Sequence, residues 1–103
     1  MAKKVFISQP MKDKTDEEIL NERARMTEVV IEKYPDEEVE FLDTFFQNAP
    51  HEAKPLWFLA KSLEFLSSAD VAVFAPGWED YRGCRIEHTC AVEYGIDVID
   101  SGF

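Results

Sequence analysis

Residues 69–100 read ADVAVFAPGWEDYRGCRIEHTCAVEYGIDVID, and they decide the fold because a strand, a loop, a helix and a strand follow one another directly. Residues 71–75 are a short apolar run rich in β-branched side chains, which is typical of a strand buried on both faces of a parallel sheet. A Pro-Gly pair ends this strand. The helix is predicted to begin near Gly83 or Cys84 and to stop at Gly95, where glycine suits a left-handed cap.

The second strand of this unit is predicted at residues 96–99. A strand, a crossover helix and a second strand of this length form a right-handed parallel unit. In open α/β sheets the ligand binds outside the carboxyl ends of the strands. We therefore expect residues 78–87 to lie in a ligand-binding crevice.

The preceding residues add two more strands and two more helices. The strands are predicted at residues 4–8 and 39–42, and the helices at residues 15–34 and 55–67. Thr15 at the start of the first helix forms a capping box with the glutamate three residues later. Helical spacing predicts that one face of each helix packs on the sheet, and these residues are Leu20, Ala24, Thr27, Ile31 and Tyr34 in the first helix and Leu56, Ala60, Leu63 and Leu66 in the second.

These elements predict a single α/β domain over residues 1–103. We expect a mostly parallel sheet of about four strands in the order 2-1-3-4, flanked by helices. This order places the carboxyl ends of strands one and three side by side. The loops after Ser8 and Ala75 then share one crevice.

The composition limits the kinds of partner. The chain has 103 residues, of which 46% are hydrophobic, and a formal net charge of −10. Long nucleic acids bind basic surfaces, so this charge argues against them, whereas a small anion held by a few local groups is compatible with it. Neither a signal peptide nor an apolar run of membrane-spanning length is recognised, which favours a cytoplasmic protein with no membrane partner. Cys84 and Cys90 lack the spacing of metal ligands, and we expect no metal and no cofactor.

The second predicted helix is apolar on more than one face. Trp57, Phe58 and Phe65 are spread around it, away from the residues expected to face the sheet. A helix that is hydrophobic all round is usually buried all round. Either the loop that carries Phe45 and Phe46 covers these side chains or another subunit does, and we favour a homo-oligomer, either a dimer or a tetramer.

Glu87 is the sharpest candidate for chemistry. It is predicted in the first turn of the last helix, where its carboxylate projects into the crevice and the helix dipole keeps it ionised as a nucleophile or base. The alternative is that a glutamate simply suits any first turn. Asp80 or Glu79, in the preceding loop, is the candidate second carboxylate of an acid/base pair, unless both belong to an acidic surface loop.

Aromatic and basic residues accompany these carboxylates. Trp78 and Tyr81 are predicted to stack on a planar ligand such as a nucleobase, or to pack on their own domain. Arg82, Gly83 and Arg85 lie at the start of the helix, where backbone N–H groups favour an anion. The two arginines are expected to bind a phosphate or to pair with the nearby carboxylates.

The loop after the first strand forms the opposite wall of the predicted crevice. Ser8 and Gln9 can hydrogen-bond a sugar or a phosphate, and Lys12 either binds an anion or is a solvated loop charge. Cys84 at the amino end of the last helix is a weaker candidate, as a thiolate nucleophile.

Four short segments, spread over nearly the whole chain, carry a family resemblance. They are ISQPM at 7–11, ADVAV at 69–73, PGW at 76–78 and RGCRIE at 82–87, the last followed by Ala91 and Gly95. With these segments the chain resembles the nucleoside 2-deoxyribosyltransferase superfamily, and most closely its small, mostly uncharacterised bacterial and phage-borne members.

The resemblance implies a flavodoxin-like three-layer fold, a dimer or larger assembly, and a site for a nucleoside or nucleotide. It also implies an N-glycoside-processing enzyme, a transferase or a nucleotide N-glycosidase, in which Glu87 attacks the anomeric carbon of the sugar and the base departs. Transferases of the family usually carry an aspartate in the helix before the third strand, and Ser62 occupies the matching position here. The alternative function is a catalytically silent nucleotide-binding or oligomeric interaction module of the same fold.

Overall fold

The computed structural model describes residues 2–101. These residues form a four-stranded, fully parallel sheet in the order β2-β1-β3-β4. The strands are β1 (Lys3–Ser8), β2 (Val39–Phe41), β3 (Val71–Phe74) and β4 (Asp97–Asp100). The predicted α/β class and the predicted strand order are both confirmed. Strand β1 pairs with β3 from Val5 opposite Val71 to Ser8 opposite Phe74, so the two strands end at the same edge.

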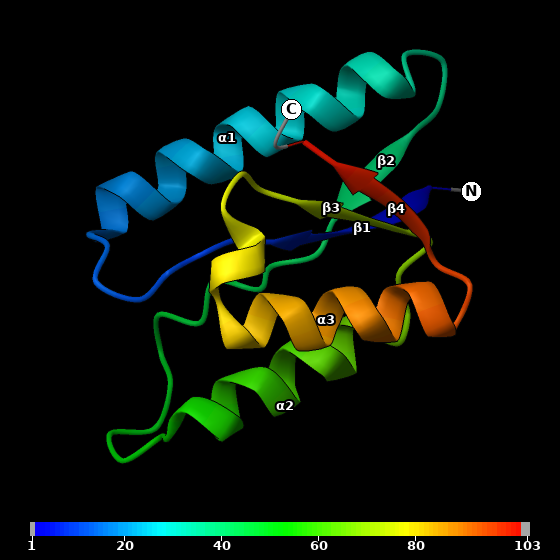
Figure 1. The fold of residues 1–103 in the computed structure, drawn as a ribbon. Coiled ribbons are helices and arrows are strands. Elements are labelled where there is room, and N and C mark those ends of the chain that lie inside the picture. Colours follow the sequence, from blue (N-terminus) through cyan, green and yellow to red (C-terminus); the bar gives the residue numbers. More distant parts are fainter. Residues whose placement is uncertain (1, 102–103) are drawn as a thin grey trace.

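The helices cover both faces of the sheet and complete a three-layer fold of the flavodoxin or Rossmann type. Helix α1 (Asp16–Lys33) lies on one face, and α2 (Pro55–Leu66) and α3 (Arg82–Glu93) lie together on the other, as Figure 1 shows. A short 3-10 helix, η1 (Trp78–Asp80), connects β3 to α3. Among the described residues, no helix combines the length and the apolar character that crossing a membrane requires.

Helix α1 begins where the capping box predicts. The Thr15 side chain accepts a hydrogen bond from the Glu18 backbone N–H at 3.1 Å, and the Glu18 carboxylate accepts one from the Thr15 N–H at 2.9 Å. Of the predicted sheet-facing residues, Tyr34 packs against the core, but the prediction is wrong for Leu20 and Ile31, which are 50% and 49% exposed. The buried stripe is Ile19, Met26 and Val30. It is offset by one residue, or about 100° around the helix, from the predicted one.

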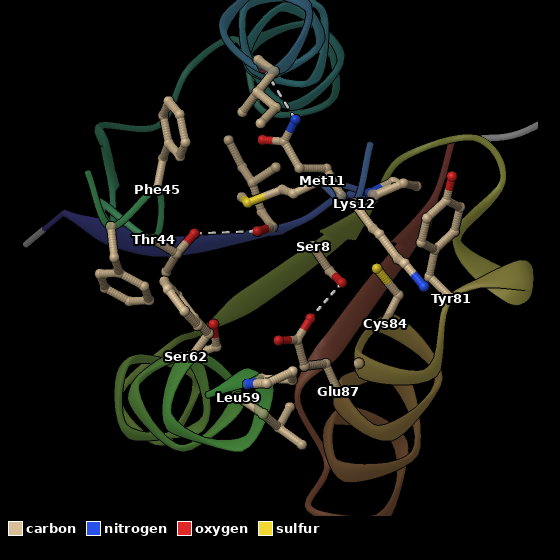
Figure 2. Close-up of a pocket in the computed structure, with 18 residues that line it drawn as sticks. Ser8, Met11, Lys12, Thr44, Phe45, Leu59, Ser62, Tyr81, Cys84 and Glu87 are labelled. Atoms are coloured by element: carbon tan, nitrogen blue, oxygen red, sulfur yellow. Dashed lines mark hydrogen bonds between the residues drawn. The ribbon is translucent and has the colours of Figure 1, made fainter. Parts of the chain in front are cut away.

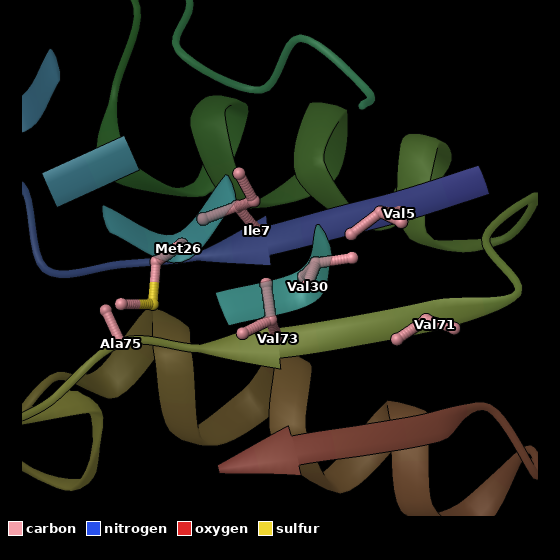
Figure 3. Packing of buried hydrophobic residues seen from close by; sticks show 7 residues of the cluster. All are labelled: Val5, Ile7, Met26, Val30, Val71, Val73 and Ala75. Atoms are coloured by element: carbon pink, nitrogen blue, oxygen red, sulfur yellow. The ribbon is translucent and has the colours of Figure 1, made fainter. Parts of the chain in front are cut away.

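The core has one cluster on each face of the sheet. Figure 3 shows the cluster under α1, in which side chains of alternate strand positions meet two residues of the helix: Val5, Ile7, Val71, Val73 and Ala75 with Met26 and Val30. Phe6, Ala72 and Phe74 point to the other face, where they pack with Leu66 and Ala91. Every residue of β3 is buried, which confirms that this strand is covered on both faces.

The prediction for α2 is correct in part. Leu66 is buried and Leu63 packs against the core, but Leu56 is 72% exposed and Ala60 is also exposed. The helix therefore touches the sheet layer mainly through its carboxyl-terminal half. The chain's own loop covers part of its aromatic side, because the Phe46 ring lies 6.1 Å from Trp57 and 5.7 Å from Phe65, whereas Phe58 is 37% exposed.

Helix α3 begins at Arg82, slightly before the predicted start, and its last helical residue is Glu93. Gly95 follows with φ 73°, a left-handed conformation that favours glycine, as expected for a cap. At the opposite edge of the sheet, the Asp70 carboxylate accepts a hydrogen bond from the Lys4 N–H at 2.8 Å. Asp70 thus joins two strands at the end remote from the cavity described below.

Candidate functional site

A cavity of about 420 Å³ opens at the carboxyl end of β1, close to the end of β3. Its walls are the loop after β1, the segment from Thr44 to Phe46 that follows β2, the inner side of α2, and the first two turns of α3, as Figure 2 shows. This is the edge at which the parallel sheet predicts a ligand. Its volume lies within the usual range for small-molecule sites, roughly 300–1,000 Å³.

Ser8 and Glu87 meet on the floor of this cavity. The Ser8 hydroxyl donates a hydrogen bond of 2.6 Å to Glu87 Oε1, although the two residues are 79 positions apart in the chain. Both are buried, with 1% and 7% of their surfaces exposed. Glu87 lies in the second turn of α3 and not in the first, because the helix already begins at Arg82. The second turn brings the carboxylate under the end of β1, where it faces Ser8 (Figure 2).

Burial controls the charge of this carboxylate. It raises the pKa of Glu87 to about 7, while hydrogen bonds from Ser8 and Ser62 act in the opposite direction. Burial therefore opposes the predicted effect of the helix dipole, which favours the ionised form of Glu87. The dipole acts mainly within the first turn, and desolvation outweighs it at this depth. At neutral pH the ionised and protonated forms of Glu87 are present in comparable amounts.

Cys84 lies beside the pair, one turn before Glu87, and is also buried. Burial is the main cause that raises the pKa of its thiol to about 11, and the Glu87 carboxylate adds to the shift. Cys84 is consequently a neutral thiol at physiological pH, which argues against the thiolate nucleophile considered from the sequence.

Four further predicted binding residues line the cavity: Gln9, Lys12, Tyr81 and Gly83. The Gln9 side chain is already engaged, because its Nε2 donates to the carbonyl of Ile19 at 3.0 Å and its Oε1 accepts from Arg23 at 3.0 Å. Gln9 therefore shapes the wall instead of offering a free amide to a sugar. In Figure 2, Lys12, Tyr81 and Cys84 lie on one side of the cavity, with the Lys12 side chain exposed to solvent.

The remaining predicted residues are not brought together with Glu87. Among the described residues, the cavity lining does not include Trp78, Glu79, Asp80, Arg82 or Arg85. Glu79 and Asp80 are exposed on η1, so neither supplies a second carboxylate to the cavity floor. The Arg85 side chain is exposed and donates to the carbonyl of Glu79 at 2.9 Å.

Trp78 packs on its own domain, which was the alternative reading of this residue. Its ring stacks on His88 at a centroid distance of 4.0 Å and an interplanar angle of 9°. Nε2 of His88 lies 3.3 Å from the Asp100 carboxylate, within ion-pair distance but without hydrogen-bond geometry. Within residues 2–101, no three His, Cys, Asp or Glu side chains come together as a metal site requires.

The sequence reasoning missed most of the apolar wall. The residues of this wall are Phe45, Phe46, Phe58 and Leu59, and Ser62 of α2 also lines the cavity. The available signal was the position of Phe45 and Phe46, just beyond the carboxyl end of β2. The sequence predicts these residues only as one of two possible covers for α2, and Phe46 does contact that helix.

No family model, no curated protein and no solved structure matches this chain. The likeness to nucleoside 2-deoxyribosyltransferases accordingly rests on the sequence segments alone.

Proposed function

We propose that the protein is an N-glycoside-processing enzyme in which Glu87 is the nucleophile that attacks the anomeric carbon of a small nucleoside or nucleotide. The observation that carries this proposal is the buried Glu87 carboxylate on the cavity floor, which accepts the 2.6 Å hydrogen bond from Ser8. A buried carboxylate that is held by a hydroxyl donor and faces a cavity of ligand size can act as the nucleophile of covalent glycosyl transfer.

The proposed first step uses the ionised form of Glu87. A carboxylate oxygen forms a bond to C1′ of the sugar, the bond from C1′ to the base nitrogen breaks, and its electron pair leaves with the base. The base takes a proton from water at the open side of the cavity. Water then attacks C1′, the ester bond to Glu87 breaks, the sugar keeps the hydroxyl group, and the released proton passes to solvent or to Glu87. The net reaction consumes one water and yields free sugar and free base.

The walls of the cavity suggest an orientation for the substrate. Phe45, Phe46 and Phe58 provide an apolar, aromatic surface for the planar base. Ser8 holds Glu87 beneath the sugar through its hydrogen bond, and Ser62 lines the cavity beside them. If the substrate carries a 5′-phosphate, the exposed ammonium of Lys12 is the lining group with the opposite charge.

Two observations favour a second candidate, a nucleotide-binding module without turnover. Glu87 has its pKa raised to about 7, so only part of the population is ionised at neutral pH. Among the described residues that line the cavity, Glu87 has no second carboxylate beside it to protonate the departing base. Such a module keeps the affinity of the cavity for a nucleoside but does not break the glycosidic bond.

The decisive experiment incubates the purified protein with deoxynucleosides and deoxynucleoside 5′-monophosphates and follows free base by chromatography. Glu87→Gln preserves the shape of the side chain but removes the nucleophile. Glu93→Gln, an exposed change on the same helix, is the matched control. Base release that is lost in Glu87→Gln and kept in Glu93→Gln supports the enzyme. Calorimetric binding without base release in any of the three proteins supports the binding module instead.

A further inference from the structure

Arg23 is a charged residue within the stripe of α1 that faces the sheet. It lies one turn after Ile19 and one turn before Met26, both of which are buried, and its own side chain is partly buried. Burial lowers the pKa of Arg23, while the nearby Asp43 carboxylate acts in the opposite direction. A guanidinium at a core-facing position is tolerated only when its N–H groups find acceptors, so its partners indicate its role.

The hydrogen bonds of Arg23 go to neutral oxygens in two different loops. Its Nη1 donates to Gln9 Oε1 at 3.0 Å and to Thr44 Oγ1 at 3.3 Å, and its Nη2 donates to the carbonyl of Leu42 at 3.2 Å. The Thr44 hydroxyl in turn donates to the carbonyl of Ile7 at 3.3 Å. One guanidinium therefore connects α1, the loop after β1 and the loop after β2.

These contacts lie directly behind the cavity. Gln9 and Thr44 are buried and line it, whereas Arg23 is not among the described lining residues. Phe45 and Phe46 follow Thr44 in the chain and form the aromatic wall opposite α3. Here the term aromatic wall means these two residues. Without Arg23, the Thr44 hydroxyl keeps its hydrogen bond to the carbonyl of Ile7 but loses the one from the guanidinium.

We propose that Arg23 is a positioning residue that fixes the aromatic wall relative to the Ser8–Glu87 pair. It acts through Thr44 and Gln9 and touches no substrate. The kinetic consequence rests on the proposed function: loss of Arg23 weakens binding of the base but leaves the chemistry at Glu87 intact. Glu87 is held by its hydrogen bond from Ser8 on β1, which does not depend on Arg23.

A measurement without any ligand tests the position of the wall. Trp57 contacts Phe46, and with Trp78→Phe as background it is the single tryptophan of the chain. Arg23→Met is expected to increase acrylamide quenching of Trp57 emission, because a loosened wall uncovers the indole. Arg25→Met is the matched control, since Arg25 is an exposed residue of the same helix that pairs with Glu22. Unchanged quenching in a folded Arg23→Met protein overturns the proposal.

Two milder variants keep the test decisive if Arg23→Met does not fold, as judged by circular dichroism. Arg23→Lys retains the charge, but a single ammonium group cannot bond to all of the acceptors. Its acrylamide quenching of Trp57 is therefore expected to lie between that of the parent protein and that of Arg23→Met. Thr44→Val removes the bond from Arg23 and the bond to Ile7, and it is expected to change quenching in the same direction. Parent-like quenching in both folded variants contradicts the proposal.

Steady-state kinetics of base release, with the nucleoside or nucleotide that the parent protein cleaves, test the consequence for binding. Arg23→Lys is expected to raise KM about tenfold while kcat stays within about a factor of two, because ground-state and transition-state binding are lost together. A fall in kcat at unchanged KM argues against a positioning role through the wall. If no protein releases base, the proposed function fails, and the quenching of Trp57 alone decides the role of Arg23.

Discussion

Ser8 and Glu87 join the first strand to the last helix through a buried hydrogen bond of 2.6 Å across 79 positions of the chain. The parallel pairing of β1 with β3 places the end of β1 over the beginning of α3, which follows β3 through η1. A serine at the end of one strand and a glutamate in the second turn of a helix thus become neighbours. The pair orients the carboxylate, and burial around it sets its charge.

The first prediction concerns the pH dependence of catalysis. Burial raises the pKa of Glu87 to about 7. In the proposed reaction only the ionised carboxylate attacks the sugar. We expect kcat/KM for base release to rise with pH through about 7 and to level off above it. In Ser8→Ala this rising limb shifts to higher pH, because the lost hydrogen bond lowers the pKa of Glu87 in the parent protein.

Thr89→Ala, an exposed change on α3, should leave the pH profile unchanged. An identical limb in the Ser8 variant contradicts the role of this hydrogen bond.

The second prediction concerns the stability of the fold and needs no substrate. The pKa of Glu87 is raised from 4.5 to about 7 in the folded state, so the native protein binds more protons than the unfolded chain between these values. Stability from this group is fully present below pH 4.5 and is lost as pH rises through about 7. The difference amounts to roughly 3 kcal/mol at most.

Denaturant unfolding between pH 5 and pH 8 measures this effect. Glu87→Gln is expected to flatten the decline and to be more stable than the parent protein above about pH 7, because a neutral amide does not have to lose a proton in the buried site. Glu93→Gln should keep the parent slope, since that residue is exposed. Equal slopes in the parent and Glu87→Gln proteins would show that Glu87 titrates normally.

The sequence predicted the sheet better than the helix faces, for a physical reason. Strand β3 is apolar at every position, so both of its sides can be buried. Its place in the centre of a parallel sheet therefore follows without deciding which side faces the core. Helix α1 has apolar residues on neighbouring stripes, and periodicity alone does not distinguish Ile19 from Leu20. The choice depends on which stripe fits over Val5, Ile7, Val71 and Val73, and that is a tertiary contact.

The sequence predicts the site residues whose positions follow from the strand order. It does not predict those whose positions depend on the conformation of a loop. Ser8 and Glu87 belong to regular elements at the carboxyl edge of the sheet, and both were identified from the sequence. Asp80 and Trp78 follow the same strand, but η1 directs Trp78 onto His88 and leaves Asp80 exposed. The contribution of Ser62 and the aromatic wall depends on how α2 and its preceding loop pack. No local pattern encodes that packing.

The third prediction tests the packing of α1 with two adjacent residues. Val30 is fully buried between the helix and the sheet, whereas Ile31 is 49% exposed. Val30→Ala is expected to lower the free energy of unfolding by about 2 kcal/mol, through lost burial and the cavity left behind. Ile31→Ala removes more atoms but should cost well under about 1 kcal/mol. Urea unfolding of both variants checks the order, and the reverse order would restore the stripe originally predicted for this helix.

The fourth prediction is that the protein associates through the outer face of α2. Leu56 of α2 is 72% exposed. Ile86 is 36% exposed on α3, which lies beside α2 on the same face of the sheet (Figure 1). Large apolar side chains that remain exposed on this layer are available for contact with a second copy. Sedimentation velocity is expected to give at least twice the mass of one chain, and Leu56→Glu should shift the protein toward the monomer. Leu20→Glu is the matched control, because Leu20 is 50% exposed on α1, across the sheet. A monomeric parent protein, or equal dissociation by both changes, excludes α2 as the contact surface.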